Sequence, residues 1–242
     1  MLSQAFQPFD LSTKASCNVN ESPHCSLKVG VVRSKGIVGS SYFEFGNSKV
    51  MCCVMCPRAG ARQSLQSASL DHGSFEVEVR YSSHIIQEGV KSERKLEKEE
   101  RASCWVQNAL QSAILLQFYP KLLITVSVIV LQSSQYDLSA MVNGVTLALA
   151  DASVQMRDLP CSYSMFLTKN ISQLGADNDE NSTTSVICAE FTVAMLPALR
   201  VTSNTHVEGR WSRDTIAAAD HRLSAKCDEM RALMKSKLNK GL

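Results

Sequence analysis

The sequence predicts a layered α+β fold, or the closely related α/β kind, in which mixed sheets pack against helices. Three observations support this prediction. Apolar and polar residues alternate along residues 74–82, as in a half-buried strand. Residues 121–132, KLLITVSVIVLQ, are rich in the β-branched side chains of a central strand, and residues 137–152 and 213–239 read as helices. Because sheet and helix segments alternate along the chain, layers of both are expected.

The elements follow an amino-terminal arm. Residues 1–26 are polar without sustained periodicity and are expected to be flexible, whereas residues 27–242 are expected to form a single domain. Gly46-Asn47 lies between two strand-like runs and predicts a hairpin turn, and Pro120 is expected to end the first helix. The expected strands are 27–33, 38–45, 48–56, 74–82, 121–132, 160–169, 185–197 and 199–207, and the expected helices are about 91–119, 137–152 and 213–239.

Composition argues against several classes of protein. A formal net charge of +2 is too small for a dedicated nucleic-acid binder, so any RNA contact would be local or shared with partners. The amino terminus lacks a basic stretch followed by an apolar core, and Gln117, Pro120 and Lys121 interrupt the longest apolar region. Neither a secretory signal nor a membrane span is therefore expected. Nine cysteines without a signal fit the reduced thiols of an intracellular protein.

The cysteine-rich stretch KVMCCVMCPRAG raises the question of a redox or metal site. On a strand Cys52 and Cys56 share one face and Cys53 takes the other, so Cys53 and Cys56 do not converge on one ion. Pro57 follows, no helix pattern begins there, and no second CxxC pair completes a zinc site. Thiols that fill the core are therefore favoured over chemistry.

Other familiar chemical motifs are absent from the sequence. It holds no GxGxxG, GxxxxGK, HExxH or GxSxG pattern, and the acidic stretch ADNDEN lacks the spacing of a calcium loop. No metal site is expected. The five histidines lie far apart and are expected on the surface: His24, His72, His84, His206 and His221.

Four stretches in register resemble the RNase PH family. GSSYFEFGNSKVMCCVMCPR (39–58) is similar to the family's Gly-Ser-Ala strand, Gly-Asn-Thr-Lys turn and Gly-Pro-Arg strand end, with Cys56 in place of the last glycine. LQSAILLQFYPKLLITVSVIVLQ (110–132) resembles its helix and central strand. LALADASVQMRDL (147–159) resembles its Leu-Ala-Leu-Ala-Asp-Ala-Gly helix end, and EFTVAMLP (190–197) a later strand. The resemblance implies the RNase PH fold, which is ribosomal protein S5 domain 2-like.

The same resemblance implies a degenerate active site. In active members a Gly-Ser-Arg at the start of the helix after the central strand holds the attacking phosphate through backbone N–H groups and a guanidinium. The matching positions are Tyr136, Asp137 and Leu138, so a carboxylate and an aliphatic chain replace the anion clamp. The family's acid-base carboxylate corresponds to Glu190, and its companion falls near Thr184. No catalytic residue and no cofactor are therefore expected.

Inactive chains of this family form the six-subunit ring of the eukaryotic RNA exosome. The resemblance thus implies a structural, non-catalytic ring subunit in the nucleus, nucleolus and cytoplasm, which helps to form the RNA-guiding channel for 3'-to-5' processing and decay. Its expected partners are other ring subunits, S1/KH cap subunits and single-stranded RNA, with no membrane. The alternatives are an active phosphate-dependent 3'-to-5' exoribonuclease and a ribosome-associated protein sharing the fold. Four arginines in or beside loops are candidate RNA contacts: Arg58, Arg62, Arg80 and Arg94.

Overall fold

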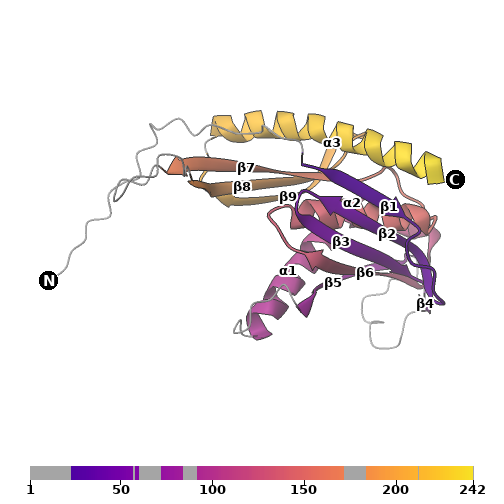
Figure 1. Cartoon of the computed structure of the whole chain (residues 1–242). Helices are drawn as coiled ribbons and strands as arrows, with labels where there is room; N and C mark the ends of the chain where they lie inside the picture. Colours follow the sequence, from indigo (N-terminus) through magenta and orange to yellow (C-terminus); the bar gives the residue numbers. More distant parts are fainter. Residues whose placement is uncertain are drawn as a thin grey trace.

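Two β-sheets and three long helices make up the part of the chain that the computed structural model describes, residues 23–56, 58–59, 72–83, 92–171, 184–211 and 213–241 (Figure 1). The strands are β1 (Cys25–Val29), β2 (Ile37–Phe45), β3 (Ser48–Met55), β4 (Arg58–Ala59), β5 (Ser74–Tyr81), β6 (Leu122–Gln132), β7 (Cys161–Ile171), β8 (Thr184–Leu196) and β9 (Val201–Gly209). The helices are α1 (Ser92–Gln111), α2 (Asp137–Asp151) and α3 (Arg213–Gly241), with a short 3-10 helix η2 (Leu116–Phe118). The predicted mixture of sheets and helices is confirmed, and no helix in these ranges is long and apolar enough to cross a membrane.

The larger sheet has six strands, in the order β1-β2-β3-β6, with β4 and β5 also paired to β6. All pairs are antiparallel except β5 with β6, which run parallel. The β2–β3 hairpin closes at the predicted turn, where Gly46 has a φ of +58°, a left-handed value that glycine adopts without a steric penalty. One face of β6 is fully buried, as expected of a central strand: Ile124, Val126, Val128 and Val130.

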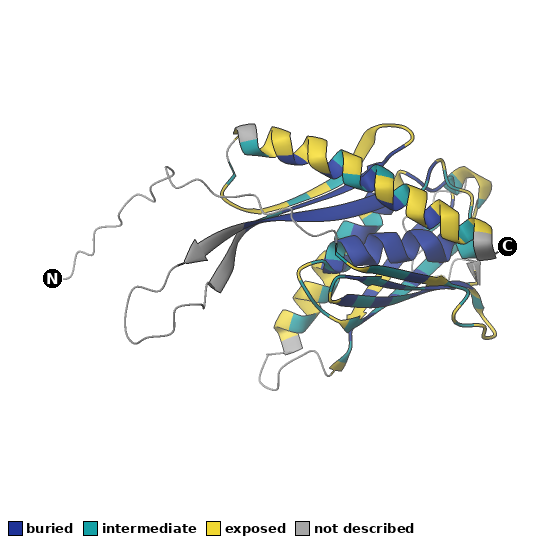
Figure 2. Cartoon of the chain, turned by 45° about the horizontal axis from the view of Figure 1, so that its top comes forward, coloured by how far each residue is buried: buried dark blue, intermediate teal, exposed yellow. Residues whose placement is uncertain are grey.

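Helix α2 lies between the two sheets and is almost entirely buried (Figure 2). It packs against β2, β3 and β7. Its small residues permit a close approach, because a Cβ added to Gly144 would lie 2.8 Å from the Cys52 sulfur. Ser41 Oγ also donates a hydrogen bond to the Gly144 carbonyl at 2.6 Å. The apolar, small-residue pattern of this segment therefore belongs to a helix that is covered on all sides.

The smaller sheet is antiparallel in the order β7-β8-β9, and α3 lies along the outside of β7 (Figure 1). Helix α1 covers the outer edge of β5. Ser103 Oγ accepts the Val79 N–H at 2.9 Å. Glu99 Oε1 accepts the Tyr81 N–H at 2.8 Å. These side chains satisfy backbone groups that would otherwise pair with a further strand, so this edge of the sheet is closed.

Some element boundaries differ from the predictions. Helix α1 ends at Gln111 rather than near Pro120, because Ile114 leaves the helical path to form an isolated bridge with Met156. Strand β1 ends at Val29, four residues earlier than expected, and a surface loop follows it. The two-residue strand β4 was not predicted and pairs with β6 beyond the end of β3.

The cysteines at β3 fill the core only in part. Cys52 is fully buried against α2 and Cys53 is nearly buried on the opposite face of the sheet, and burial raises the pKa of both thiols. Cys56 is exposed, so the prediction of a core-filling thiol is wrong at this position. The strand has ended there: the Cys56 N–H bonds the Gly36 carbonyl at 2.7 Å, and the side chain is left to solvent.

Candidate functional site

The three positions predicted to form a degenerate phosphate site, Tyr136, Asp137 and Leu138, lie near the ends of two neighbouring strands of the larger sheet. The carboxyl ends of β5 and β6 are adjacent because these strands are parallel, with Tyr81 opposite Val130. Helix α2 begins shortly afterwards, at Asp137. In α/β proteins, anionic ligands commonly bind beyond the carboxyl ends of strands and at the amino end of a helix. This location is therefore suited to hold an anion.

The carboxylate of Asp137 is itself the anion at this location. Its Oδ1 accepts hydrogen bonds from Ser48 Oγ at 2.6 Å and from the Ser134 N–H at 2.8 Å. Its Oδ2 accepts one from Ser133 Oγ at 2.5 Å, and the Tyr81 hydroxyl is also bonded to this carboxylate. Asp137 is 7% exposed. The sequence predicted a carboxylate that faces the site, and the structure shows one that is turned inward and held by the site's own donors.

Tyr136 and Leu138 complete the three positions without supplying a cation. The Tyr136 ring meets Phe45 and Phe166 edge-on, with ring centroids 5.1 Å apart in each pair. Burial raises the pKa of the Tyr136 hydroxyl. Leu138 is partly buried and packs against the main core. The charge that would bind a phosphate in active members of this kind of fold is therefore missing here.

Glu190 lies on β8 and is half-buried. A chain of hydroxyl groups connects it with the first turn of α2. Thr192 Oγ1 donates to Glu190 Oε1 at 3.0 Å, and Ser164 Oγ lies 2.7 Å from Thr192 Oγ1. Ser139 Oγ in turn lies 2.6 Å from Ser164 Oγ. The hydroxyl chain therefore lies between α2 and the smaller sheet, whereas the partners of Asp137 lie on the side of the larger sheet. Asp137 is nevertheless near enough to Glu190 to influence its pKa.

Several carboxylates gather in this region. Burial raises the pKa of Glu190, and the neighbouring carboxylates of Glu208 and Asp137 act in the same direction. Burial, together with the carboxylates of Asp137 and Glu99, raises the pKa of Tyr81. The Thr192 hydroxyl and the His206 side chain act on the pKa of Glu190 in the opposite direction, so this region holds several carboxylates beside one imidazole.

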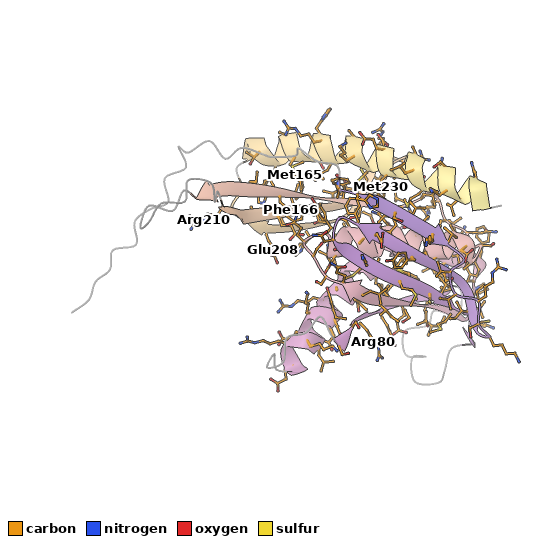
Figure 3. All side chains as sticks on the ribbon, viewed as in Figure 1. Arg80, Met165, Phe166, Glu208, Arg210 and Met230 are labelled. Atoms are coloured by element: carbon orange, nitrogen blue, oxygen red, sulfur yellow. The ribbon has the colours of Figure 1, made fainter. Side chains whose placement is uncertain are left out.

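The four arginines predicted to contact RNA are placed only in part. Arg58 lies in β4, where its backbone alone is described, and Arg62 lies outside the described residues. The Arg80 side chain is exposed on β5, 3.7 Å from the Glu78 carboxylate (Figure 3). Arg94 is exposed on α1. The structure does not bring Arg80 or Arg94 into bonding contact with the candidate site, and RNA contact by these residues stays a prediction.

Most of the groups that hold Asp137 could not be found from sequence patterns. Ser48 is 89 positions away along the chain, and Tyr81 ends a different strand. Ser133 and Ser134 lie only 4 and 3 positions before Asp137, so these two partners are local in the sequence. Thr184, the predicted companion of Glu190, begins β8 opposite Ile171, and the acidic loop before it lies outside the described residues.

The described part of the chain holds no metal centre, since no three His, Cys, Asp or Glu side chains come together there. The surface prediction for the histidines is confirmed at three positions, and His84 lies outside the described residues. The exposed histidines are His24, His72 and His221, whereas His206 is half-buried and lies 3.4 Å from Glu208.

The profile of the RNase PH family, described as "3' exoribonuclease family, domain 1", matches residues 9–155, more than half of the chain. The chain is 31% identical over 197 residues to the exosome complex component RRP41 homolog of Arabidopsis thaliana, and this match covers 81% of this chain and 78% of the relative. It is 28% identical over 163 residues to exosome complex component rrp46 of Schizosaccharomyces pombe, and this match covers 66% of this chain and 67% of the relative.

The fold is similar to that in the crystal structure of rice (Oryza sativa) Rrp46. The TM-score is 0.69 with 16% sequence identity, and the match covers 91% of this chain and 97% of the other. At this identity the likeness concerns the fold, and it confirms the architecture that the sequence motifs predicted.

Proposed function

Because the chain belongs to the RNase PH family of 3' exoribonucleases, we propose that it is a non-catalytic member of the family and a structural subunit of an RNA exosome ring. The observation that carries the first part is the Asp137 carboxylate, which takes up the hydrogen-bond donors at the start of α2. The second part is supported by the relatives, both of which are named as exosome complex components.

Phosphate binding would need groups that Asp137 already uses. The Ser134 N–H and the hydroxyls of Ser48 and Ser133 all donate to this carboxylate. A unit negative charge about 4 Å from the carboxylate would be repelled by about 4 kcal/mol at an effective dielectric constant of about 20. Neither Tyr136 nor Leu138 offers a compensating cation. Phosphorolysis, which requires bound phosphate, is therefore not expected of this chain.

Assembly into a ring would bury surface that is partly apolar in the chain alone. Met51 and Ile129 are direct partners across β3 and β6, and both are half-buried on the sheet face opposite α2, as is Met55. Such a face suits contact with a neighbouring subunit. The proposed partners are other RNase PH-like ring subunits, S1/KH cap subunits and single-stranded RNA in a shared channel. The proposed location is the nucleus, the nucleolus and the cytoplasm.

Within the ring, the sequence most resembles the subunit called mRNA transport regulator three. The stretches behind this finer assignment are CSLKVGVV, where the chain enters β1, and QNALQSAILLQFYP, at the end of α1. We propose this position in the ring on that resemblance alone. The second candidate is the other short non-catalytic ring subunit, the one closest to bacterial RNase PH.

An active phosphate-dependent exoribonuclease is the second candidate, and Glu190 is the observation that favours it. This carboxyl group stands at the family's acid-base position, it is half-buried, and burial raises its pKa, as suits a general acid. Asp137 argues against this candidate because a general acid without a bound phosphate has no reaction to assist.

The first experiment incubates the purified full-length chain with labelled single-stranded RNA and inorganic phosphate. No nucleoside diphosphate is expected, and its release would overturn the non-catalytic assignment. Titration calorimetry measures the affinity of the chain for phosphate and so tests whether Asp137 prevents phosphate binding. The Asp137→Ala variant, in which the donors are free, should bind phosphate more tightly than the unmodified chain, whereas Asp220→Ala, which removes an exposed carboxylate from α3, should not.

The second experiment tags the chain in its source cells and identifies its stoichiometric partners. Recovery of RNase PH-like subunits and cap subunits is the expected result. Recovery of ribosomal proteins without these subunits would instead support the ribosome-associated alternative.

A further inference from the structure

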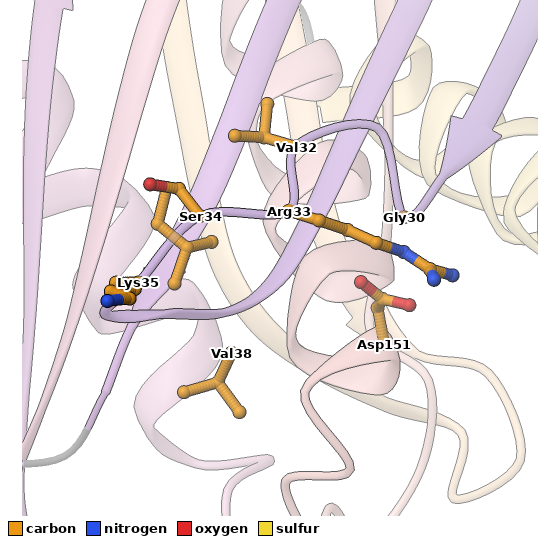
Figure 4. Close-up of a pocket in the computed structure, with 8 residues that line it drawn as sticks. Gly30, Val32, Arg33, Ser34, Lys35, Val38 and Asp151 are labelled. Carbon is orange, nitrogen blue, oxygen red and sulfur yellow. The ribbon is translucent and has the colours of Figure 1, made fainter.

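A surface cavity of about 510 Å³ opens at the far end of α2 from Asp137 (Figure 4). The loop between β1 and β2 forms most of its wall, and Asp151, the last residue of α2, lies at its base. The length of α2 separates the cavity from the candidate site by about 20 Å. A ligand here would therefore not depend on the Asp137 region.

A short free strand edge adjoins the cavity. The pairing of β1 with β2 ends at Val29 opposite Ser41, but β2 begins earlier, at Ile37. Among the described strands, residues 37–39 thus pair with β3 alone. The loop itself takes up part of this edge, because the Ser34 carbonyl accepts the Ile37 N–H at 3.1 Å and the Ser40 carbonyl accepts the Gly30 N–H at 2.8 Å. The backbone of Val38 lies between these two bonds. At Ser40 the backbone N–H is accepted by Asp151 Oδ2 at 2.9 Å, so a side chain takes the place of a neighbouring strand. Unpaired strand edges readily accept an added strand.

The cavity combines an apolar wall with two cations. Val32, Ile37 and Val38 line it, and Val38 is 45% exposed although it is a large apolar residue. Arg33 and Lys35 lie at its rim and are exposed, and neither forms an ion pair with any described residue.

One of the two cations is directed toward the carboxylate of Asp151. Figure 4 shows the Arg33 guanidinium directed toward Asp151, with Lys35 on the other side of the loop. Asp151 is already engaged by the Ser40 N–H. The rim therefore carries a net positive charge, and it complements an acidic ligand.

We propose that this cavity docks an extended, acidic segment of a partner protein. Main-chain hydrogen bonds at Val38 would hold the segment beside β2, and an apolar side chain would enter between Val32 and Val38. The carboxylates of the segment would meet Arg33 and Lys35. RNA fits less well, because none of the described residues that line the cavity is aromatic and could stack on a base, and the Asp151 carboxylate would repel a phosphate.

Fluorescence anisotropy with the full-length chain tests this proposal. The probes are a labelled peptide of alternating Val and Glu, its Val and Lys counterpart, and a labelled oligouridylate. The acidic peptide should bind, and the Arg33→Glu/Lys35→Glu variant should weaken it about tenfold or more. The control Arg222→Glu/Lys235→Glu makes the same change in net charge at two exposed positions of α3 and should leave the affinity unchanged.

A second pair of variants tests the apolar wall and also covers the case in which the charge reversal prevents folding. Val38→Asp should abolish binding of the acidic peptide. Val207→Asp, at a β9 position that is 46% exposed, should not. The proposal is overturned if the acidic peptide does not bind, if cavity and control variants lose affinity equally, or if the basic peptide or the oligouridylate binds the cavity as well as the acidic peptide does.

Discussion

Removal of the Asp137 carboxylate is expected to destabilise the chain far more than removal of a surface carboxylate. The group accepts hydrogen bonds from Ser48, Ser133 and Ser134 at 2.5 to 2.8 Å. A hydrogen bond to a charged group contributes about 1.5–3 kcal/mol, and a carboxylate in the first turn of a helix adds about 0.5 kcal/mol. Because the serine hydroxyls can rotate toward each other when the acceptor is lost, Asp137→Ala should cost about 3 kcal/mol.

Urea unfolding of the full-length chain, followed by circular dichroism, measures this cost. Asp137→Asn retains one acceptor oxygen and should lose about half as much as Asp137→Ala. Asp220→Ala serves as the exposed control and should change the free energy of unfolding by less than about 0.5 kcal/mol. A double-mutant cycle with Ser48→Ala should show coupling. A cost for Asp137→Ala no larger than that of the control, or strict additivity with Ser48→Ala, would refute the reasoning.

Three further predictions concern packing, pH and a buried ion pair. Gly144→Ala should lower the free energy of unfolding by about 1–2 kcal/mol, because overpacking against the Cys52 sulfur outweighs the gain in helix propensity. A second substitution in the same chain, Cys52→Ala, should remove this penalty. Burial raises the pKa of Glu190 above its unfolded value, so its stabilising contribution is full below about pH 4.5 and is lost as the pH rises through the folded pKa. The melting temperature of Glu190→Gln should therefore be above that of the unmodified chain at pH 8 but not at pH 4. A difference in melting temperature that does not change with pH would contradict this prediction. Asp158→Ala should lower the free energy of unfolding in urea by about 3 kcal/mol. The reason is that Arg231, which lies 3.0 Å from the Asp158 carboxylate, loses its buried partner. A decrease below about 1 kcal/mol would count against a structural role for this ion pair.

The elements that were predicted well are those whose burial repeats along the chain. In β5, Phe75, Val77 and Val79 face the core and alternate with exposed charged residues, so the sequence pattern reports the pleat directly. Helix α2 was recognised for a different reason: it is covered on almost all sides, and its residues are mostly apolar, with small residues among them. Both patterns are local, and a single sequence contains them.

The features that were missed depend on contacts between distant segments. The apolar run after Gln111 gave no reason to end α1 before Pro120, and the bridge between Ile114 and Met156 that ends it joins residues from two different loops. The inward orientation of Asp137 likewise depends on a serine from the first hairpin. Such contacts follow from the tertiary fold, which local periodicity does not encode.

The buried hydroxyl chain shows a structural role for the region around Glu190. Ser139, Ser164 and Thr192 are at most 2% exposed, and each has a hydrogen-bond partner, so the cost of burying these polar groups is offset. Together they join α2 to β7 and β8, and the chain runs from the helix turn that Asp137 begins to Glu190. Both carboxylates accept hydrogen bonds from other residues of the chain, so both take part in the internal contacts of the fold. Under the proposed function, these contacts would hold the subunit together without a bound phosphate.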